Sequence, residues 1–508
     1  MKRVCILVLV IVFSALLIQG CGGGGSSASP NLQNPGGSGE DDPGDIPPPV
    51  IYELGDLIDL GDLLYPSGDH WYFTWARVIN DEGTVIGQSN NGSPVRAAFK
   101  WEPGSEEMTF LGIHVDPIFS CELTPPAFFG PIYSEAVDIN ATGTIIGNSS
   151  TGFNWPDDNE KRAFLWENGV FTDLHPPGAL WSETVDINNN GEVVVTLSFS
   201  RNSPCDIISG AFYWDGETFT TVGSTLVPVY QGLGGVLGES SEAVAINENG
   251  QTIVNAGDTV IFHDLNWDVI EVLNHLPFAC ITVAVDINDS GFVNNDGIPD
   301  GHVIGNSGCF DRKVLATILD YTFLELPEIL PKGPTIDRLE KVQGFFWDGG
   351  AMYPVDHLGG GKSVAANINN KDQVVGGALT EDGKTHAFLW TLGPDEKGVI
   401  RDLGTLGGDN SFALAINEAG QVVGWAETGE SYSEQGVVRP VRHAFLWEDG
   451  QMYDLGVHND FYDYSFIPPY PFSYAVDINE LGVLNTLTGN SVTINEHSRG
   501  FFLSPEMP

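Results

Sequence analysis

The chain has 508 residues, with 68 Asp and Glu against 21 Lys and Arg and a formal charge of −47 at pH 7. So acidic a surface repels nucleic acid and anionic lipid headgroups, which excludes both as partners. A body of this length is too large for one ordinary core unless it is built from repeats.

The N-terminus has the pattern of an export signal. Lys2 and Arg3 precede an apolar run over residues 4–18, which is too short to span a membrane comfortably. The run ends in LIQGC, which resembles a bacterial lipoprotein lipobox. The resemblance implies that residues 1–20 are removed and that Cys21 carries lipid chains, which anchor a protein without a spanning helix. An ordinary secretory signal with a chance cysteine is the alternative.

Residues 21–50 are rich in Gly, Ser, Pro and Asp and cannot bury a core, so we expect a flexible tether. Such a tether would hold the folded body, residues 51–508, clear of the bilayer. With the lipid anchor, it predicts a protein attached to the outer membrane or the cell surface.

The body consists of eight degenerate copies of a repeat. The first half of each copy reads Ala-x-Asp-Ile-Asn-x-x-Gly, as in AVDINATG from Ala136 and ALAINEAG from Ala413. The second half reads Ala-Phe-Leu-Trp-x-x-Gly and ends in Asp-Leu-Gly. The repeated asparagines are Asn80, Asn140, Asn188, Asn247, Asn288, Asn369, Asn417 and Asn479.

Each half of the repeat predicts a β-hairpin, because Asn can start a tight turn and Gly accepts a positive φ. Two hairpins give four strands, and the asparagines are 41 to 81 residues apart. Four-stranded units of this size are typical of propeller blades. We therefore predict an all-β propeller with eight blades favoured. Seven blades are possible, because the repeat is weak over residues 253–347, and a β-solenoid is the second choice of fold.

The two ends of the body predict how the ring closes. The last unit stops at GFFLSPEMP without an Asp-Leu-Gly strand, whereas ELGDLIDLGDLL from Glu53 supplies such a strand before the first unit. An N-terminal strand that completes the last blade would remove an exposed sheet edge.

Several sequence motifs of the repeat resemble those of the bacterial HAF family of extracellular repeat proteins: THAFLW, RHAFLW, DLGTLGG and AINEAGQVVG. The resemblance covers nearly all of the body and implies an exported β-repeat protein, without an established activity or catalytic residues. His386 and His443 stand in the name motif, but Arg96 and Arg162 occupy the same place in other units. We therefore expect this position to be a strand face and not a metal ligand.

An insert in the fifth unit is a candidate calcium site. It resembles the calcium loops of thrombospondin type 3 repeats, in which Asp and Asn oxygens surround a hard cation. The candidate ligands are Asp286, Asn288, Asn294, Asp296 and Asp300. Phe292 stands where an acidic residue is expected, and a polar turn without a metal is the alternative.

Three connections between units are long, over residues 112–135, 223–242 and 456–474. Equivalent connections emerge on one face of a ring, where insertions commonly build a binding surface. Their aromatic and acidic residues suit sugar rings and hydroxyls, or a peptide. The expected contact residues are Phe128, Phe129, Tyr133, Tyr230, Phe461, Tyr462, Asp463, Tyr464 and Tyr470. The alternative is that these rings only fix long loops to the body.

Four cysteines of the body permit two disulfides in an exported protein. Cys280 and Cys309 flank one repeat and are the favoured pair, with Cys121 and Cys205 as the remaining two. Buried thiols are the alternative.

The sequence contains no HExxH, CxxC pair or GxSxG motif. We therefore expect a monomeric, non-enzymatic surface protein that binds a glycan or a protein, or serves as a scaffold, through its inter-blade loops. No cofactor other than calcium is expected. The alternatives are a hydrolase or lyase of extracellular polysaccharide, for which no carboxylate pair can be identified, and a structural envelope protein.

Overall fold

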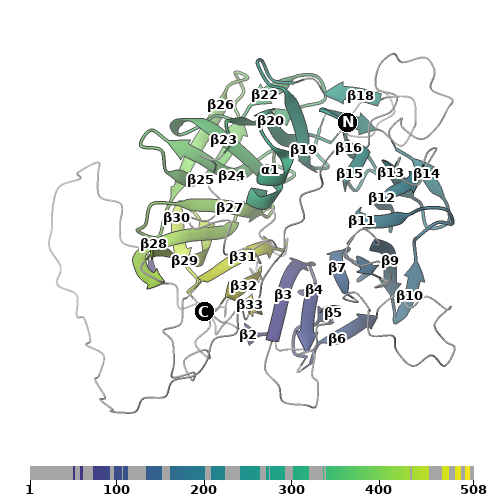
Figure 1. Ribbon diagram of the computed structural model, residues 1–508. Helices are drawn as coiled ribbons and strands as arrows, with labels where there is room; N and C mark the ends of the chain where they lie inside the picture. The colour runs from purple at the N-terminus through teal and green to yellow at the C-terminus, as the bar shows by residue number, and fades with distance from the viewer. Residues whose placement is uncertain are drawn as a thin grey trace, which may run out of the picture. The chain divides into compact units, whose positions relative to one another are not determined.

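Each repeat forms a set of antiparallel strands in the computed structural model, and these blades follow one another around a ring (Figure 1). Five blades are separate four-stranded sheets, whereas single parallel pairs, Arg442 with Phe472 and Phe73 with Ser498, join the last two blades and the first into one sheet. The described residues all belong to the compact unit Pro48–Pro508. They are residues 50–51, 58–60, 72–91, 96–105, 107–112, 133–150, 161–200, 207–222, 241–263, 270–273, 275–291, 301–319, 336, 339–434, 437–456, 472–479, 487–492 and 498–503.

Seven blades each contain four strands that are consecutive in the chain. Blades 1 to 4 consist of β3 (Tyr72–Ile79), β4 (Val85–Asn91), β5 (Arg96–Trp101) and β6 (Thr109–Gly112); β7 (Ser134–Ile139), β8 (Ile145–Ser150), β9 (Lys161–Glu167) and β10 (Val170–Asp173); β11 (Trp181–Ile187), β12 (Val193–Ser200), β13 (Ile207–Trp214) and β14 (Phe219–Thr221); and β15 (Ser241–Ile246), β16 (Thr252–Ala256), β17 (Thr259–His263) and β18 (Ile270–Leu273). Blades 5 to 7 consist of β19 (Ile281–Ile287), β20 (Val303–Cys309), β21 (Lys341–Trp347) and β22 (Met352–Pro354); β23 (Gly359–Ile368), β24 (Val374–Thr380), β25 (Thr385–Leu392) and β26 (Gly398–Gly404); and β27 (Ser411–Ile416), β28 (Val422–Glu434), β29 (Val437–Glu448) and β30 (Gln451–Asp454).

An eighth blade contains strands from both ends of the body. Its first three strands are β31 (Phe472–Ile478), β32 (Leu487–Val492) and β33 (Ser498–Leu503), and its outer strand is β2 (Ile58–Asp59). The pairing of Ile58 with Phe502 places β2 antiparallel to β33. Since β2 lies in the predicted N-terminal segment, both the propeller and its closure by an N-terminal strand are confirmed. The short β1 (Val50–Ile51) pairs in parallel with β30 of blade 7.

A circle of hydrogen bonds between the repeated asparagines joins all eight blades. The Nδ2 group of Asn80 donates to the backbone oxygen of Asn140 in the next blade, at 3.3 Å, and the other copies do the same in turn. The last copy, Asn479, donates to the backbone oxygen of Asn80 at 3.4 Å and so closes the circle. No member is more than 6% exposed. The repeated asparagine therefore fixes the contact between blades as well as the turn.

The same asparagines also shape the turns. The Oδ1 atom of Asn140 accepts hydrogen bonds from the backbone nitrogens of Thr142 and Thr144, at 3.1 and 3.0 Å. The turn then passes through Gly143, whose φ of +81° is accessible mainly to glycine. In blade 6 this place is taken by Asp372, with a φ of +58°.

Buried hydroxyl groups form a second set of contacts between blades. The Ser or Thr two residues before the repeat alanine is fully buried in all eight copies. Ser411 shows the usual pattern: its Oγ atom accepts from the backbone nitrogen of Ala387 at 2.8 Å and donates to the backbone oxygen of Gly404 at 2.5 Å. Both partners lie in the preceding blade. Around these polar contacts, apolar clusters such as Ile86, Ala98, Leu111, Ala136 and Phe164 fill the space between neighbouring sheets.

The repeat aspartate provides a third contact. Asp477 accepts from the backbone nitrogens of Ile478 in its own blade and Ile79 in blade 1, at 2.9 and 3.0 Å. Burial raises the pKa of Asp477 to about 7, although both hydrogen bonds oppose this shift. Burial likewise raises the pKa of Asp286 to about 7. In blade 6 an asparagine, Asn367, occupies this position and accepts from Ile416 at 3.0 Å.

The helix α1 (Arg312–Leu319) connects β20 to β21 in blade 5. None of the helices formed by the described residues is long and apolar enough to cross a membrane.

The asparagine circle predicts a large effect of Asn417→Ala. The side chain is fully buried, accepts from the backbone nitrogen of Gln421 at 3.0 Å and donates to Asn479 at 3.1 Å. Its removal leaves buried backbone groups without partners, so we expect the free energy of unfolding in urea to fall by about 2 kcal/mol. The exposed control Lys397→Ala should change it by less than about 0.5 kcal/mol. Equal midpoints for Asn417→Ala and wild type would show that the circle does not stabilise the ring.

The raised pKa of Asp477 predicts a pH-dependent effect of Asp477→Asn. Because the folded pKa lies above that of the unfolded chain, wild type is stabilised most below a pH of about 4 and loses this stability as the pH rises to about 7. Asparagine loses one hydrogen bond at every pH but carries no charge. We therefore expect the stability of the variant relative to wild type to rise by about 4 kcal/mol between pH 4 and 8. The exposed control Asp395→Asn should show no such rise, and a constant difference for Asp477→Asn would contradict the assignment.

Candidate functional site

The two ends of the ring differ because hairpin turns alternate between them. The turn face carries the asparagine turns, and the loop face carries the connections between blades and between the second and third strands. The first strand of every blade lies on the inner side of the ring and starts at the loop face (Figure 1). Just before the repeat alanine, these inner strands carry Trp75, Glu135, Glu183, Glu242, Val283, Val364, Phe412 and Tyr474.

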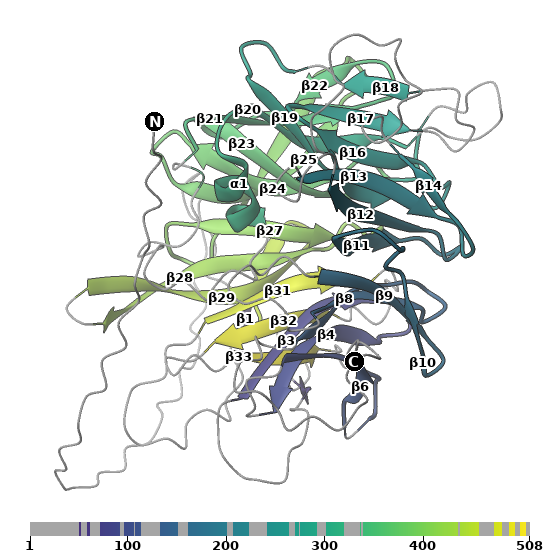
Figure 2. The same cartoon turned by 45° about the vertical axis from the view of Figure 1, so that its right-hand side comes forward.

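Five of these eight residues are apolar and share one core cluster with α1. Leu315 and Ile318 of α1 pack with Trp75, Phe412 and Tyr474 in this cluster. In both views α1 lies beside β23 and β27 (Figure 1 and Figure 2). Leu315 and Ile318 of α1 thus belong to the same apolar cluster as these inner-strand residues, and the helix lies beside the inner strands of blades 6 and 7.

The other three residues, Glu135, Glu183 and Glu242, belong to blades 2, 3 and 4. The Nζ atom of Lys161, at the start of β9, lies 2.6 Å from a carboxylate oxygen of Glu183 and 3.7 Å from one of Glu135. The side chains of Lys161, Glu135 and Glu183 are 31%, 24% and 36% exposed. Burial alone would lower the pKa of Lys161, but the two carboxylates outweigh it and raise the pKa.

Arg96 and Tyr133 lie next to this group. Their backbones form a parallel β-bridge, and the Coulomb attraction of Glu135 acts on the guanidinium of Arg96. We call Arg96, Tyr133, Glu135, Lys161 and Glu183 the polar cluster. It holds cations, carboxylates and one phenol, all partly accessible on the loop face.

Tyr133 is the one member of the predicted aromatic set among the described residues, and it is half-buried. The other predicted contact residues lie outside the described residues: Phe128, Phe129, Tyr230, Phe461, Tyr462, Asp463, Tyr464 and Tyr470. Sequence reasoning missed Glu135, Glu183 and Lys161. An alignment of the eight copies at the column before the alanine would have found the two glutamates, because the other copies in blades 5 to 8 and blade 1 carry apolar residues there.

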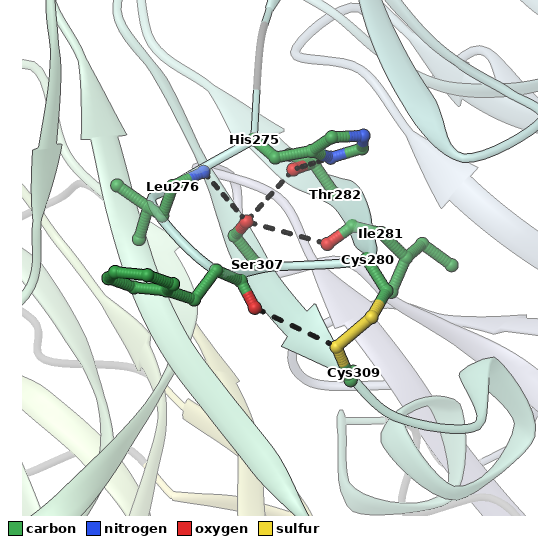
Figure 3. Close-up of a disulfide and its surroundings, with 8 residues drawn as sticks. His275, Leu276, Cys280, Ile281, Thr282, Ser307 and Cys309 are labelled. Carbon is green, nitrogen blue, oxygen red and sulfur yellow. Dashed lines mark hydrogen bonds between the residues drawn. A yellow bond between two sulfur atoms is a disulfide. The ribbon is translucent and has the colours of Figure 1, made fainter.

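The predicted disulfide between Cys280 and Cys309 is present in the structure. It links the start of β19 to the end of β20 (Figure 3). Cys121, Cys205 and the lipidation candidate Cys21 lie outside the described residues.

Two of the five calcium candidates are described, and both make structural hydrogen bonds. One carboxylate oxygen of Asp286 accepts from Ile368 and the side-chain nitrogen of Asn367, while Asn288 belongs to the asparagine circle. Asn294, Asp296 and Asp300 lie outside the described residues. Within the described part of the chain, no three His, Cys, Asp or Glu side chains are placed to hold a metal ion. Calcium binding therefore stays a prediction.

The histidines of the HAF-like motifs make hydrogen bonds with aspartates on the strand face. His386 Nδ1 lies 2.8 Å from a carboxylate oxygen of Asp402, and His443 Nδ1 lies 2.8 Å from one of Asp454. Arg162 lies 3.8 Å from Asp173 in the same arrangement. These aspartates begin the Asp-Leu-Gly motifs or their equivalent, so the contact joins the third and fourth strands of each of these blades.

The assignment of Arg96 to the histidine position is wrong. In β5 the residue that corresponds to Ala163 is Ala98, because Gln88 pairs with Ala98 as Asn148 pairs with Ala163. Arg96 therefore corresponds to Lys161, one residue before the histidine position. This correction places two cations of neighbouring blades in the same column at the loop face.

No family model matches the chain, and no curated protein is similar to it in sequence. Several solved structures resemble the chain in part. A prolyl endopeptidase structure has a TM-score of 0.42 at 8% identity, covering 83% of this chain and 54% of that one. The acylaminoacyl peptidase of Pyrococcus horikoshii has a TM-score of 0.40 at 8% identity, covering 85% and 59%. A Trypanosoma rangeli sialidase in complex with the inhibitor DANA has a TM-score of 0.30 at 10% identity, covering 80% and 57%. The chain spans a little more than half the length of these structures, and at such identities the likeness concerns the fold alone.

Proposed function

We propose that this protein is a non-enzymatic binding propeller of the cell surface, which holds a glycan at the loop face over the polar cluster. A protein partner at the same face is the alternative. The observation that carries the proposal is the type of residue that stands just before the repeat alanine on the inner strands, which differs between two parts of the ring. Apolar residues of one core cluster stand at this position in five blades, whereas Glu135, Glu183 and Glu242 stand there in blades 2 to 4.

The polar cluster has the chemistry that a hydroxyl-rich ligand needs. Sugar hydroxyls both donate and accept hydrogen bonds, so a site for them should offer both kinds of group. Lys161 and Arg96 supply donors, Glu135 and Glu183 supply acceptors, and the ring of Tyr133 adds an apolar surface. These side chains start on rigid strands, which favours binding because little order is lost when a ligand arrives.

The same geometry argues against a glycosidase. A glycosidase places two carboxyl groups on either side of the scissile bond, about 5 Å apart or more. Here the Nζ atom of Lys161 lies between Glu135 and Glu183, at 3.7 and 2.6 Å. The ammonium occupies the place that the scissile bond would need, so the pair suits ligand binding better than hydrolysis.

The remaining parts of the chain complete the proposal. We propose that Cys21 carries the lipid anchor and that residues 21–50 form the tether. The insert with Asn294, Asp296 and Asp300 would take calcium close to blade 5.

The test is retention of the purified protein on bacterial and plant polysaccharides, with calcium and with chelator. We expect wild type to be retained on at least one polymer without release of oligosaccharide. The double variant Lys161→Gln and Glu183→Gln should lose about ten-fold in affinity, since it removes two charged hydrogen-bonding groups.

The control for this test is Glu248→Gln on the turn face, where the carboxylate accepts from the backbone nitrogen of Asn189 at 3.0 Å. The amide keeps an acceptor there, and we expect unchanged retention. Release of oligosaccharide would overturn the non-enzymatic role. If the double variant is still retained, the ligand does not bind at the polar cluster. If wild type loses retention in chelator, calcium binding by the insert is supported.

A further inference from the structure

Two connections between blades have the same local structure. One covers residues 175–182, between blades 2 and 3, and the other covers residues 275–282, between blades 4 and 5. In the first, His175 Nδ1 lies 3.0 Å from Ser182 Oγ; in the second, His275 Nδ1 lies 2.9 Å from Thr282 Oγ1. Each contains a turn that a backbone hydrogen bond closes. The nitrogen of Ala179 donates to the oxygen of Pro176 in the first connection, and the nitrogen of Ala279 donates to the oxygen of Leu276 in the second. The two segments can therefore be compared residue by residue.

The fourth residue of each connection has a positive φ, +92° at Gly178 and +68° at Phe278. Glycine takes this conformation without strain, but a residue with a Cβ atom does so at a cost, and a bulky one is an outlier. The first connection thus has the residue that the backbone favours. The second has a phenylalanine in its place.

Burial does not offset the strain at Phe278. Its side chain is 93% exposed, the largest exposure among the large hydrophobic residues of the described chain. Phe110, at 49%, is the other exposed phenylalanine among them. Phe278 therefore gains almost nothing from the hydrophobic effect in this structure, although a phenylalanine gains much when buried.

The segment that carries Phe278 is fixed on both sides. Leu276 is buried in the core cluster of blades 4 and 5, and its backbone nitrogen donates to Ser307 Oγ at 3.1 Å. Two residues after Phe278, Cys280 forms the disulfide with Cys309. Figure 3 shows Leu276, Thr282 and Ser307 joined by hydrogen bonds beside this disulfide. The aromatic ring is therefore held out from a rigid support.

We infer that Phe278 is a stacking platform for a sugar ring of the bound glycan. The apolar face of a pyranose packs against one flat aromatic ring, and a rigidly held ring loses little entropy on binding. A single projecting ring fits this use better than it fits a protein interface, which needs a larger contiguous patch.

Phe278 lies on the same face of the ring as the polar cluster, because it belongs to a connection between blades. Its connection leaves blade 4, the last blade with a glutamate in the column before the alanine, and enters blade 5, where that column is apolar. This inference rests on the proposed glycan binding and adds an aromatic contact to it.

The test compares Phe278→Gly with wild type in affinity and in stability. On a polysaccharide that retains wild type, Phe278→Gly should lose about ten-fold in affinity, as expected for an aromatic stacking contact. Its thermal midpoint should equal or exceed that of wild type, because glycine relieves the strain. Phe278→Tyr keeps the ring and should retain the affinity, and Phe110→Ala on the outer strand of blade 1 should have no effect on binding.

The outcomes separate the two proposals. Wild-type affinity in Phe278→Gly would overturn the inference alone and would assign the exposed ring to another partner, such as a protein. A lower midpoint of Phe278→Gly would also overturn it, since the ring would then serve stability. Failure of wild type to bind any polysaccharide would overturn both the inference and the proposed function.

Discussion

The closed circle of asparagine side chains is the constraint on which the rest of this propeller depends. All eight asparagines hold the next blade through Nδ2, and copies such as Asn140 also hold their own turn through Oδ1, so one residue type sets both the hairpin and the spacing between sheets. Because the members are buried, any blade that shifted would leave polar groups without partners. The bond from Asn479 to Asn80 makes this requirement apply to the whole ring, and β2 completes the sheet at the same junction.

This arrangement separates stability from recognition. The asparagine, aspartate and serine contacts lie at fixed repeat positions and use mainly backbone partners in the neighbouring blade. The residue just before the repeat alanine takes no part in them. It can therefore be a buried apolar residue of one core cluster in one part of the ring and a glutamate beside Lys161 in another. In blades 2 and 3, where this residue is partly exposed, the position is suited to ligand contacts.

Much of the fold could be predicted from the sequence because the repeat encodes it locally. Asn-x-x-Gly specifies the turn, and the spare strand near Ile58 specifies the closure, so both followed from spacing alone. The site was less accessible. Glu135 and Lys161 are 26 positions apart in the sequence, and only the pairing of strands brings Lys161 beside Glu135 and Glu183. The misplacement of Arg96 was a shift of one residue in a degenerate repeat, which the strand register corrects because Gln88 pairs with Ala98 as Asn148 pairs with Ala163.

Asp372 and Phe278 show two different ways in which a strained backbone is used. Both have a positive φ at a position where an equivalent segment has glycine. The carboxylate of Asp372 accepts from Asn288, Ser290 and His302 across the junction of blades 5 and 6, so its strain is offset inside the ring. The side chain of Phe278 points into solvent, where no such compensation arises from burial. Backbone strain that no contact within the protein offsets is most simply explained by a contact with another molecule. We therefore propose that the loop between blades 4 and 5 is shaped for a ligand and that its disulfide keeps it in that shape.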